Sequence, residues 1–461
     1  MVGHDLDRSL GLYPTMMISM GAMIGSGIFV LPALGYKKAG PAVIVAYVLA
    51  AAVVLPAALS KAEMATAMPE SGGTYLYIDR ALGPLFGTIA GIGAWFSLVF
   101  KSSFALVGLG AYLLLFAPLS QGAVVYVALA LGVVVVALNV SGTKLSGQVQ
   151  AVIVSLVVVS LAAYTLNAGF TVDTARYAPF STGGNIGVVT AAAFVFVSYA
   201  GVTKVASVAE EVKDPGRNLP RAILGSMTIM TVLYVAVVGA VVGLSDPDVL
   251  KTGGPGGTAS LTPMADGAGS LLGGFGVVFI SVVAVVALTS MANAGILSSS
   301  RFPLAMSRDD LFPSPFGRID ARFKTPRNAV LLTGALLVLL IAFVPVIELA
   351  KLASAFQILV FSVINVALVA FREADVPSYQ PEFEAPGYPY VQAFGFFAGL
   401  GLLTQMGTLP ILGAAGIIGG SGLIYLLYGR SRTDRTGAVG TILHGRRGDP
   451  DDGLAATDPD D

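Results

Sequence analysis

A cluster of glycines around one serine is the strongest chemical signal in this sequence. The stretch reads Gly21-Ala22-Met23-Ile24-Gly25-Ser26-Gly27-Ile28-Phe29, and Pro32 follows shortly after. Glycine costs about 1 kcal/mol relative to alanine inside a helix, so the three glycines predict a helix that opens here. The N–H groups of Gly25, Ser26 and Gly27 would begin a second half-helix, whose positive end suits a carboxylate. Packing of small residues against a neighbouring helix is the alternative interpretation.

A second candidate helix break and an isolated lysine are two further candidates for functional sites. The stretch Ser198-Tyr199-Ala200-Gly201-Val202-Thr203 is a second candidate helix break, and Lys204 follows it directly. Lys101 stands alone between two stretches without Asp, Glu, Lys or Arg, 81–100 and 102–143. A lysine at the centre of a membrane-spanning helix costs at least about 2.5 kcal/mol, which favours a functional role. A structural lysine bonded to carbonyls and a snorkelling lysine remain the alternatives for Lys101.

Several kinds of chemistry are excluded by the residue types. There are no cysteines, and the two histidines, His4 and His444, lie near the chain ends. A Ser–His hydrolase and a thiolate or histidine metal site therefore have no components, and we expect neither an enzyme nor a metal or other cofactor. The formal net charge is −1 without a basic block, so we expect no nucleic-acid partner.

The composition indicates that these segments belong to membrane-spanning helices. Of the 461 residues 55% are hydrophobic and only 11% are charged, against roughly 25% charged in soluble domains. The chain contains a series of long stretches without Asp, Glu, Lys or Arg, and each of them reaches the roughly 20 residues of a membrane-spanning helix. The stretches do not alternate polar and apolar residues, which excludes a β-barrel. The sequence therefore predicts an all-α integral membrane protein that contacts the lipid bilayer.

Turn signals within these stretches divide them into twelve predicted spans. After a short N-terminal segment, 1–10, we expect two inverted five-span units, 11–169 and 184–371, because an odd number of spans turns the second copy over. Two additional spans fill 388–428, and the acidic segment 429–461 is expected to be disordered. The span ranges are 11–35, 41–66, 84–116, 122–140, 146–169, 184–209, 221–244, 269–299, 328–346, 349–371, 388–406 and 409–428.

The distribution of Lys and Arg predicts the orientation. Most of the 26 basic residues fall in segments on the same side as the N-terminus. We therefore expect both termini to be cytoplasmic and the protein to lie in the cell membrane. The residues expected on the opposite side are Lys37, Lys38, Arg176, Lys251 and Lys351.

Four motifs in order resemble the amino acid–polyamine–organocation (APC) superfamily. They are the stretch Gly21–Phe29, the loop Pro69-Glu70-Ser71-Gly72-Gly73-Thr74-Tyr75, the segment Glu210-Glu211-Val212-Lys213-Asp214-Pro215-Gly216-Arg217-Asn218-Leu219-Pro220, and Ser300-Arg301-Phe302-Pro303-Leu304-Ala305-Met306-Ser307-Arg308-Asp309. The resemblance implies the leucine-transporter fold and a secondary amino acid transporter that works by alternating access. Paired interrupted helices in corresponding positions are the usual sign of a transporter's midplane site.

The resemblance also implies a substrate site at the two breaks. The substrate carboxylate would meet the N–H groups of Ser26 and Gly27, beside Gly25. Tyr199 would cover the substrate, or it would be a packing tyrosine, and Thr203 would face the substrate side chain. The substrate amino group would meet carbonyls near Met23, Ile24, Val197, Ser198 and Ala200, with Gly201 beside them.

Coupling to an ion has two candidate sites. Proton-dependent relatives carry a lysine in span 5, but Val157 stands at that position, so Lys101 is our candidate for a protonatable coupling group or a fixed cation. A sodium site would instead use Thr289, Ser290 and Asn293 in span 8, for which ordinary interhelical hydrogen bonding is the alternative. Exchange without ion coupling and a non-transporting amino acid sensor also fit the sequence. A channel fits less well, because paired broken helices favour alternating access.

The substrate side chain is constrained by charge. No Asp or Glu falls in the middle of a span, and a buried cation would require such a partner. We therefore expect neutral amino acids, with acidic ones open if Lys101 or Lys204 faces the site. Nothing in the sequence requires a partner subunit, and both a monomer and a homo-oligomer are compatible with it.

Overall fold

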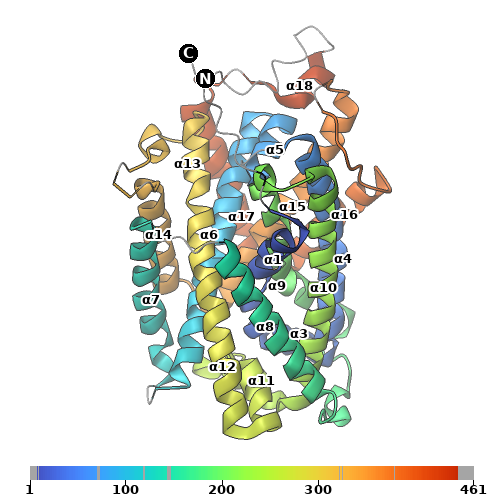
Figure 1. The fold of residues 1–461 in the computed structure, drawn as a ribbon, viewed down its shortest axis with the longest axis vertical. Coiled ribbons are helices and arrows are strands. Elements are labelled where there is room, and N and C mark those ends of the chain that lie inside the picture. Colours follow the sequence, from blue (N-terminus) through green and yellow to red (C-terminus); the bar gives the residue numbers. More distant parts are fainter. Residues whose placement is uncertain are drawn as a thin grey trace.

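The computed structural model describes residues 8, 10–69, 73–117, 120–142, 147–320, 322–323, 325–377, 379–433 and 435–444. Within these ranges the regular structure is helical, apart from one parallel β-bridge between Leu10 and Val212. The long helices run along the long axis of the molecule (Figure 1). One end holds α5 (Gly73–Leu82), α13 (Arg301–Arg308) and α18 (Gly437–His444), and is called the α18 end below. The opposite end, called the α11 end, holds α11 (Pro247–Thr252).

The predicted opening of the first span is present. The helix α1 (Leu12–Met23) ends where the Ile24 N–H donates to the Met20 carbonyl, and α2 (Ser26–Phe29) begins after Gly25. The Gly25 carbonyl accepts the first hydrogen bonds of α2, from the N–H groups of Ile28 and Phe29. After Val30 the chain continues as α3 (Leu31–Ala39). The glycines therefore mark a real interruption of the helix, as their low helix propensity predicts.

The other spans follow in the predicted order. The helices of the first half are α4 (Val43–Ala67), α6 (Pro84–Leu114), α7 (Val124–Val140) and α8 (Gly147–Ala168). The later helices are α9 (Gly184–Val195), α10 (Pro215–Leu244), α12 (Pro263–Ser299), α14 (Arg327–Phe343), α15 (Val346–Ala374), α16 (Tyr390–Leu403) and α17 (Thr408–Ile424). In the described chain, eight helical stretches are long and apolar enough to cross a membrane. The predicted spans at α1, α7, α14 and α16 hold shorter helices, so the division into twelve spans and two inverted units stays a prediction.

The predicted second break has a different form. The helix α9 does not open at Ser198; it changes at Phe196 into a tighter 3₁₀ helix, η4, which continues to Glu211. Runs of 3₁₀ helix longer than three or four residues are uncommon because their hydrogen bonds are poorer, and a mid-helix run often marks a hinge. Span 6 therefore departs from α-helical geometry near the expected place, but by tightening.

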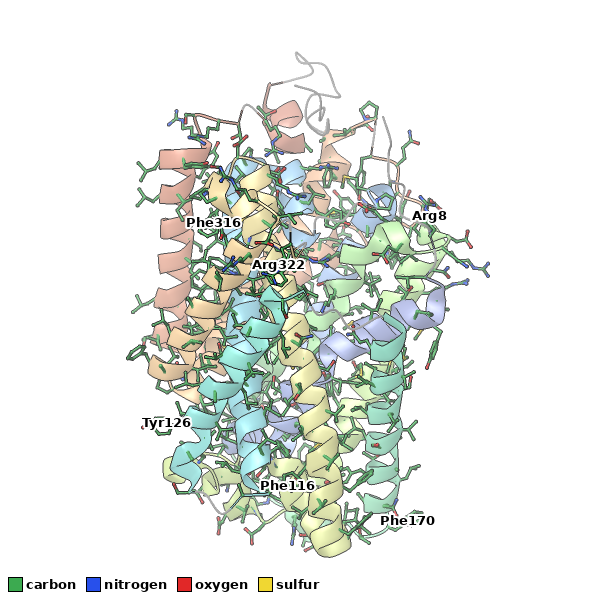
Figure 2. All side chains as sticks on the ribbon, turned by 60° about the vertical axis from the view of Figure 1, so that its left-hand side comes forward. Arg8, Phe116, Tyr126, Phe170, Phe316 and Arg322 are labelled. Atoms are coloured by element: carbon green, nitrogen blue, oxygen red, sulfur yellow. The ribbon has the colours of Figure 1, made fainter. Side chains whose placement is uncertain are left out.

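The surface is that of a membrane protein. Large apolar side chains cover the outside, whereas polar side chains such as Ser19, Ser226 and Asn365 are buried. Figure 2 shows Arg8 and Arg322 in the half nearer the α18 end, and Phe116, Tyr126 and Phe170 toward the α11 end.

An ion pair between the buried Glu63 and the half-buried Arg372 ties the α18 ends of α4 and α15 together. The Arg372 guanidinium donates to both carboxylate oxygens of Glu63, at 2.8 and 2.6 Å. The same carboxylate accepts from the Tyr379 hydroxyl and from the Ala385 N–H, so the loop between α15 and α16 is held as well. Both oxygens of the Glu63 carboxylate accept charge-assisted bonds, which fixes this corner of the bundle.

Part of the segment expected to be disordered is structured. Residues 437–444 form α18, and Ala438 at its start is buried. Before it, Arg435 lies 3.5 Å from the Asp79 carboxylate on α5. Burial raises the pKa of the Asp79 carboxyl, while Arg435 and Arg80 lower it. The expectation of disorder therefore does not hold for 437–444; residues 445–461 lie outside the described chain.

Candidate functional site

Side chains from three other helices occupy the backbone groups that the first break frees. The Ser26 N–H points at the sulfur of Met291 on α12, at 3.2 Å. The Gly27 carbonyl accepts from the Tyr47 hydroxyl of α4, at 2.6 Å. The Met23 carbonyl accepts from the Tyr234 hydroxyl of α10, at 2.7 Å. The Ser26 N–H and the Met23 carbonyl, which we expected to meet a substrate, thus have protein partners in this conformation.

The neighbouring stretch of span 6 is held by the same tyrosines. The Tyr234 hydroxyl also donates to the Ser198 carbonyl, at 3.1 Å, and so bridges spans 1 and 6. The Tyr199 hydroxyl donates to the Tyr47 carbonyl, at 3.1 Å. The ring centroids of Tyr47 and Tyr199 lie 5.3 and 5.2 Å from that of Tyr234. We call Tyr47, Tyr199 and Tyr234 the tyrosine cluster; all three side chains are fully buried.

The two reactive segments approach each other backbone to backbone. A Cβ atom added to Gly201 would lie 2.5 Å from the Ala22 oxygen and the Met23 nitrogen. A Cβ atom added to Gly27 would lie 2.6 Å from the Ser198 hydroxyl. Only glycine therefore fits at these two positions, because the Ala22–Met23 backbone at Gly201 and the Ser198 side chain at Gly27 leave no room for a Cβ atom. Val197, whose carbonyl we expected near the substrate amino group, donates its N–H to the Ser354 hydroxyl.

A cavity of about 150 Å³ lies next to these segments. Among the predicted residues, Ala200, Gly201, Thr203 and Lys101 line it, together with Ala22 of α1. The lining continues through Ser298 of α12 to residues of the α18 end, which are Gly73 and Thr74 of α5 and Arg301, Phe302 and Ala305 of α13. A pocket that combines apolar walls with a few convergent polar groups is typical of a small-molecule site.

Lys101 projects from α6 into this cavity. Its ammonium donates to the Ala22 carbonyl, at 3.0 Å, one residue before the end of α1. Three further basic side chains line the cavity, which are Lys61, Lys204 and Arg301, and the Lys61 ammonium donates to the Thr74 hydroxyl. None of the described lining residues is acidic. The electrostatic potential in this space therefore favours negative and disfavours positive groups.

The predicted site is thus divided. Met23, Ile24, Gly25, Ser26 and Gly27 are adjacent to the cavity but do not line it, and neither do Val197, Ser198 and Tyr199. Met291 lines the cavity and contacts Ser26, so its side chain stands between the two parts.

The residues proposed for a sodium site are not brought together. The Thr289 side chain is exposed on the outside of α12. The Asn293 amide oxygen accepts from the Asn139 amide of α7, at 2.8 Å. Ser290 is half-buried and lies outside the cavity lining. The bond between Asn139 and Asn293 is the interhelical contact that we gave as the alternative.

Four residues of this site were not singled out from the sequence: Lys61, Met291, Tyr47 and Tyr234. Lys61 stands directly after the charge-free stretch 39–60, near the end of span 2. A lysine at the end of a span usually reaches the membrane surface, so its burial was not predicted. Tyr47 and Tyr234 carry a hydroxyl within apolar spans, and a buried tyrosine hydroxyl usually requires a partner. That signal was available for both tyrosines. No local pattern distinguishes Met291 from a packing methionine.

Comparison with known proteins decides the family. Residues 10–429 match the family model described as amino acid permease. The chain belongs to this family. The permease is therefore a transporter of the APC superfamily rather than an enzyme, as the four motifs predicted.

Two groups of relatives extend over nearly the whole permease. It is 30% identical to the branched-chain amino acid permease BcaP of Bacillus subtilis (strain 168), over 93% of this chain and 94% of that protein. It is 29% identical to BcaP of Lactococcus lactis subsp. cremoris (strain MG1363), over 90% and 93%. The methylthioribose transporter of Bacillus subtilis (strain 168) is 28% identical, over 93% and 95%. Together with the apolar helices, these matches identify a multi-pass membrane protein that transports amino acids.

Proposed function

We propose that this permease moves neutral amino acids across the cell membrane by alternating access, with both termini cytoplasmic. The observation that carries the proposal is the cavity beside the interrupted first helix, which extends toward the α18 end. The conformation described above would then be open to the cytoplasm. The substrate would bind between the breaks, with its carboxylate at the Ser26 and Gly27 N–H groups, where the start of α2 supplies a positive dipole end.

The charge of the cavity disfavours a cationic substrate side chain. Lys61, Lys101 and Arg301 would repel arginine, lysine and polyamines, and none of the described lining residues is acidic. The apolar part of the lining, which includes Ala94, Leu98 and Val360, suits an aliphatic side chain. The names of the two BcaP relatives point in the same direction. An acidic amino acid remains the alternative that the basic residues favour.

Lys101 is the proposed coupling group. Its ammonium donates to the Ala22 carbonyl at the end of α1, so loss of the proton would weaken this bond beside the break, because a neutral amine is a poorer donor than an ammonium. A proton that binds to one conformation more tightly than to the other shifts the balance of states, which is what coupling requires. The same hydrogen bond favours a second candidate, an exchanger in which Lys101 is a fixed cation. A sensor that binds amino acids without moving them is the third candidate.

Uptake into liposomes separates these candidates. Purified permease would be reconstituted without sodium and given labelled leucine, aspartate or lysine, with and without an acidic external buffer. We expect leucine uptake that rises with the imposed pH gradient. Uptake that appears only after unlabelled amino acid is loaded inside would indicate exchange, and binding without uptake would indicate a sensor. Preferred uptake of lysine would contradict the proposed neutral substrate.

A pair of lysine variants tests the coupling group. We expect Lys101→Ala to lose the response to the pH gradient while exchange persists. The matched control is Lys351→Ala, which removes a lysine that pairs with Glu348 away from the cavity and should leave the response intact. If Lys101→Ala retains pH-driven uptake, Lys101 is not the coupling group.

A further inference from the structure

A methionine occupies the position expected for the substrate carboxylate. The Met291 sulfur lies 3.2 Å from the Ser26 nitrogen, and the Ser26 hydroxyl lies 3.8 Å from the same sulfur. Met291 approaches so closely because residue 25 is glycine, since a Cβ atom at Gly25 would overlap the sulfur. The start of α2 is therefore occupied by a side chain from α12, and an incoming anion finds this N–H group already in use.

The same side chain separates the cavity from the break. Met291 lines the cavity, whereas Gly25, Ser26 and Gly27 lie behind it and are buried. On the far side, the tyrosine cluster closes the break, because Tyr47 and Tyr234 hold the Gly27 and Met23 carbonyls. Access to the Ser26 N–H from the cavity therefore requires Met291 to move.

The chemistry of methionine suits such a movement. A thioether is a weak hydrogen-bond acceptor, whereas a carboxylate forms charge-assisted bonds that are about twice as strong as neutral ones. Methionine is also unbranched with three rotatable side-chain bonds, so it can turn away without movement of its helix. A carboxylate can thus displace the sulfur from the N–H group and regain a stronger bond than the one that is lost.

We propose that Met291 is a positioning residue that occupies the carboxylate site of the substrate-free permease and must be displaced when an amino acid binds. This inference rests on the proposed substrate site at the Ser26 and Gly27 N–H groups. Met291 then acts as an internal competitor, because the apparent affinity falls with the fraction of molecules in which the site is blocked. In a substrate-free molecule it also keeps the break covered from the cavity.

Binding measurements on the purified full-length permease test the inference. The probe is labelled leucine, or whichever amino acid of the uptake panel binds most tightly. If the side chain blocks the site in most molecules, we expect Met291→Ala to lower the dissociation constant by about threefold to tenfold. Met291→Leu keeps a similar volume without the sulfur acceptor and should lower it by less. Met264→Ala, which removes a buried methionine near the start of the same helix, is the matched control and should leave it unchanged.

A spectroscopic measurement on the unsubstituted protein does not depend on the variants' folding. The permease would be labelled with ¹³C in its methionine methyl groups, and the Met291 resonance would be assigned by its absence in Met291→Leu. We expect saturating amino acid to shift and narrow this resonance as the side chain is released. An unchanged Met291 resonance, or a dissociation constant that is equal or higher in Met291→Ala, overturns the inference while the proposed function stands. An unsubstituted permease that binds no amino acid overturns both.

Discussion

The two sides of the interrupted first helix satisfy its backbone in opposite ways. Toward the α18 end, the last turn of α1 faces a cavity, and a flexible lysine, Lys101, holds the Ala22 carbonyl. Toward the α11 end, the Met23 and Gly27 carbonyls are held by buried tyrosine hydroxyls. The first arrangement combines open space with charge, whereas the second is closely packed and carries no formal charge. The difference indicates which side is built to exchange ligands in this conformation.

Under the proposed alternating access, this difference shows which contacts must break in the opposite conformation. If the substrate leaves through the cavity, the tyrosine cluster must separate in another conformation to admit the next one from the α11 end. Tyr234 bonds both reactive segments, so it is the side chain whose release would free the most backbone groups. Backbone groups freed in this way can be tolerated at membrane depth because they would then face a cavity or a ligand.

We expect the largest effect at the close backbone contact between Gly201 of span 6 and the end of α1. Gly201→Ala would place a methyl group against the Ala22 oxygen and the Met23 nitrogen, and a backbone cannot move aside as a side chain can. Overpacking typically costs about 1–3 kcal/mol, so we expect a loss of uptake of roughly tenfold or more. Initial uptake rates and the amount of folded protein in size-exclusion chromatography would be measured.

Gly93→Ala is the matched control for that prediction. A Cβ atom at Gly93 would meet only the Val360 side chain, at 3.6 Å, which is an ordinary contact. Uptake within about twofold of the unsubstituted protein is expected, because no atom must move. Equal uptake by Gly201→Ala and Gly93→Ala would show that the two segments do not need to approach as closely as they do here.

The next effect is specific to the closed side. Tyr234→Phe removes the donor to the Met23 and Ser198 carbonyls, and an unsatisfied buried polar group costs about 1–3 kcal/mol. We expect lower thermal stability and a tyrosine cluster that opens more often. Because the chain has no cysteine, Ser198→Cys introduces a single thiol behind the cluster, and its rate of maleimide labelling reports the opening. We expect labelling to be several-fold faster with Tyr234→Phe.

Tyr177→Phe supplies the comparison for the tyrosine variant. The Tyr177 hydroxyl donates to the Gly239 carbonyl, at 2.9 Å, away from the tyrosine cluster. This variant should lose some stability without a change in the labelling of the introduced thiol. If both tyrosine variants label at the unsubstituted rate, the cluster is not the closure of the α11 side.

The sequence predicts more of the cavity side of the site than of the side that the tyrosine cluster closes. The interruption at Gly25 is a local property, because glycines weaken a helix wherever it packs, and the helix does stop there. Lys101 was also identifiable, since an isolated charge in an apolar span must find a polar environment. In contrast, the tyrosine cluster joins α4, η4 and α10, and the sequence does not indicate which spans become neighbours.

Span 6 shows a second limit of prediction from sequence. Its glycine and small residues predicted an opening, but the described chain continues as a 3₁₀ helix from Phe196 to Glu211. Gly201 is required here for close approach to Ala22, so this glycine serves packing rather than an opening of the helix. Local propensity cannot distinguish these two uses of glycine, because the deciding atoms belong to another segment.

We expect the smallest effect at Asn293, which the sequence offered for a sodium site and which bonds Asn139 in the structure. Asn293→Ala removes the bond to the Asn139 amide, and interhelical hydrogen bonds in membranes average about 0.6 kcal/mol. We therefore expect less than about a threefold change in uptake, with the same result for Asn139→Ala and no further loss in the double variant. Uptake would be measured with sodium and with an equal concentration of choline. Sodium-stimulated uptake that disappears in Asn293→Ala but persists in Asn139→Ala would instead make Asn293 an ion ligand, and the coupling site would then lie on α12 rather than at Lys101 in the cavity.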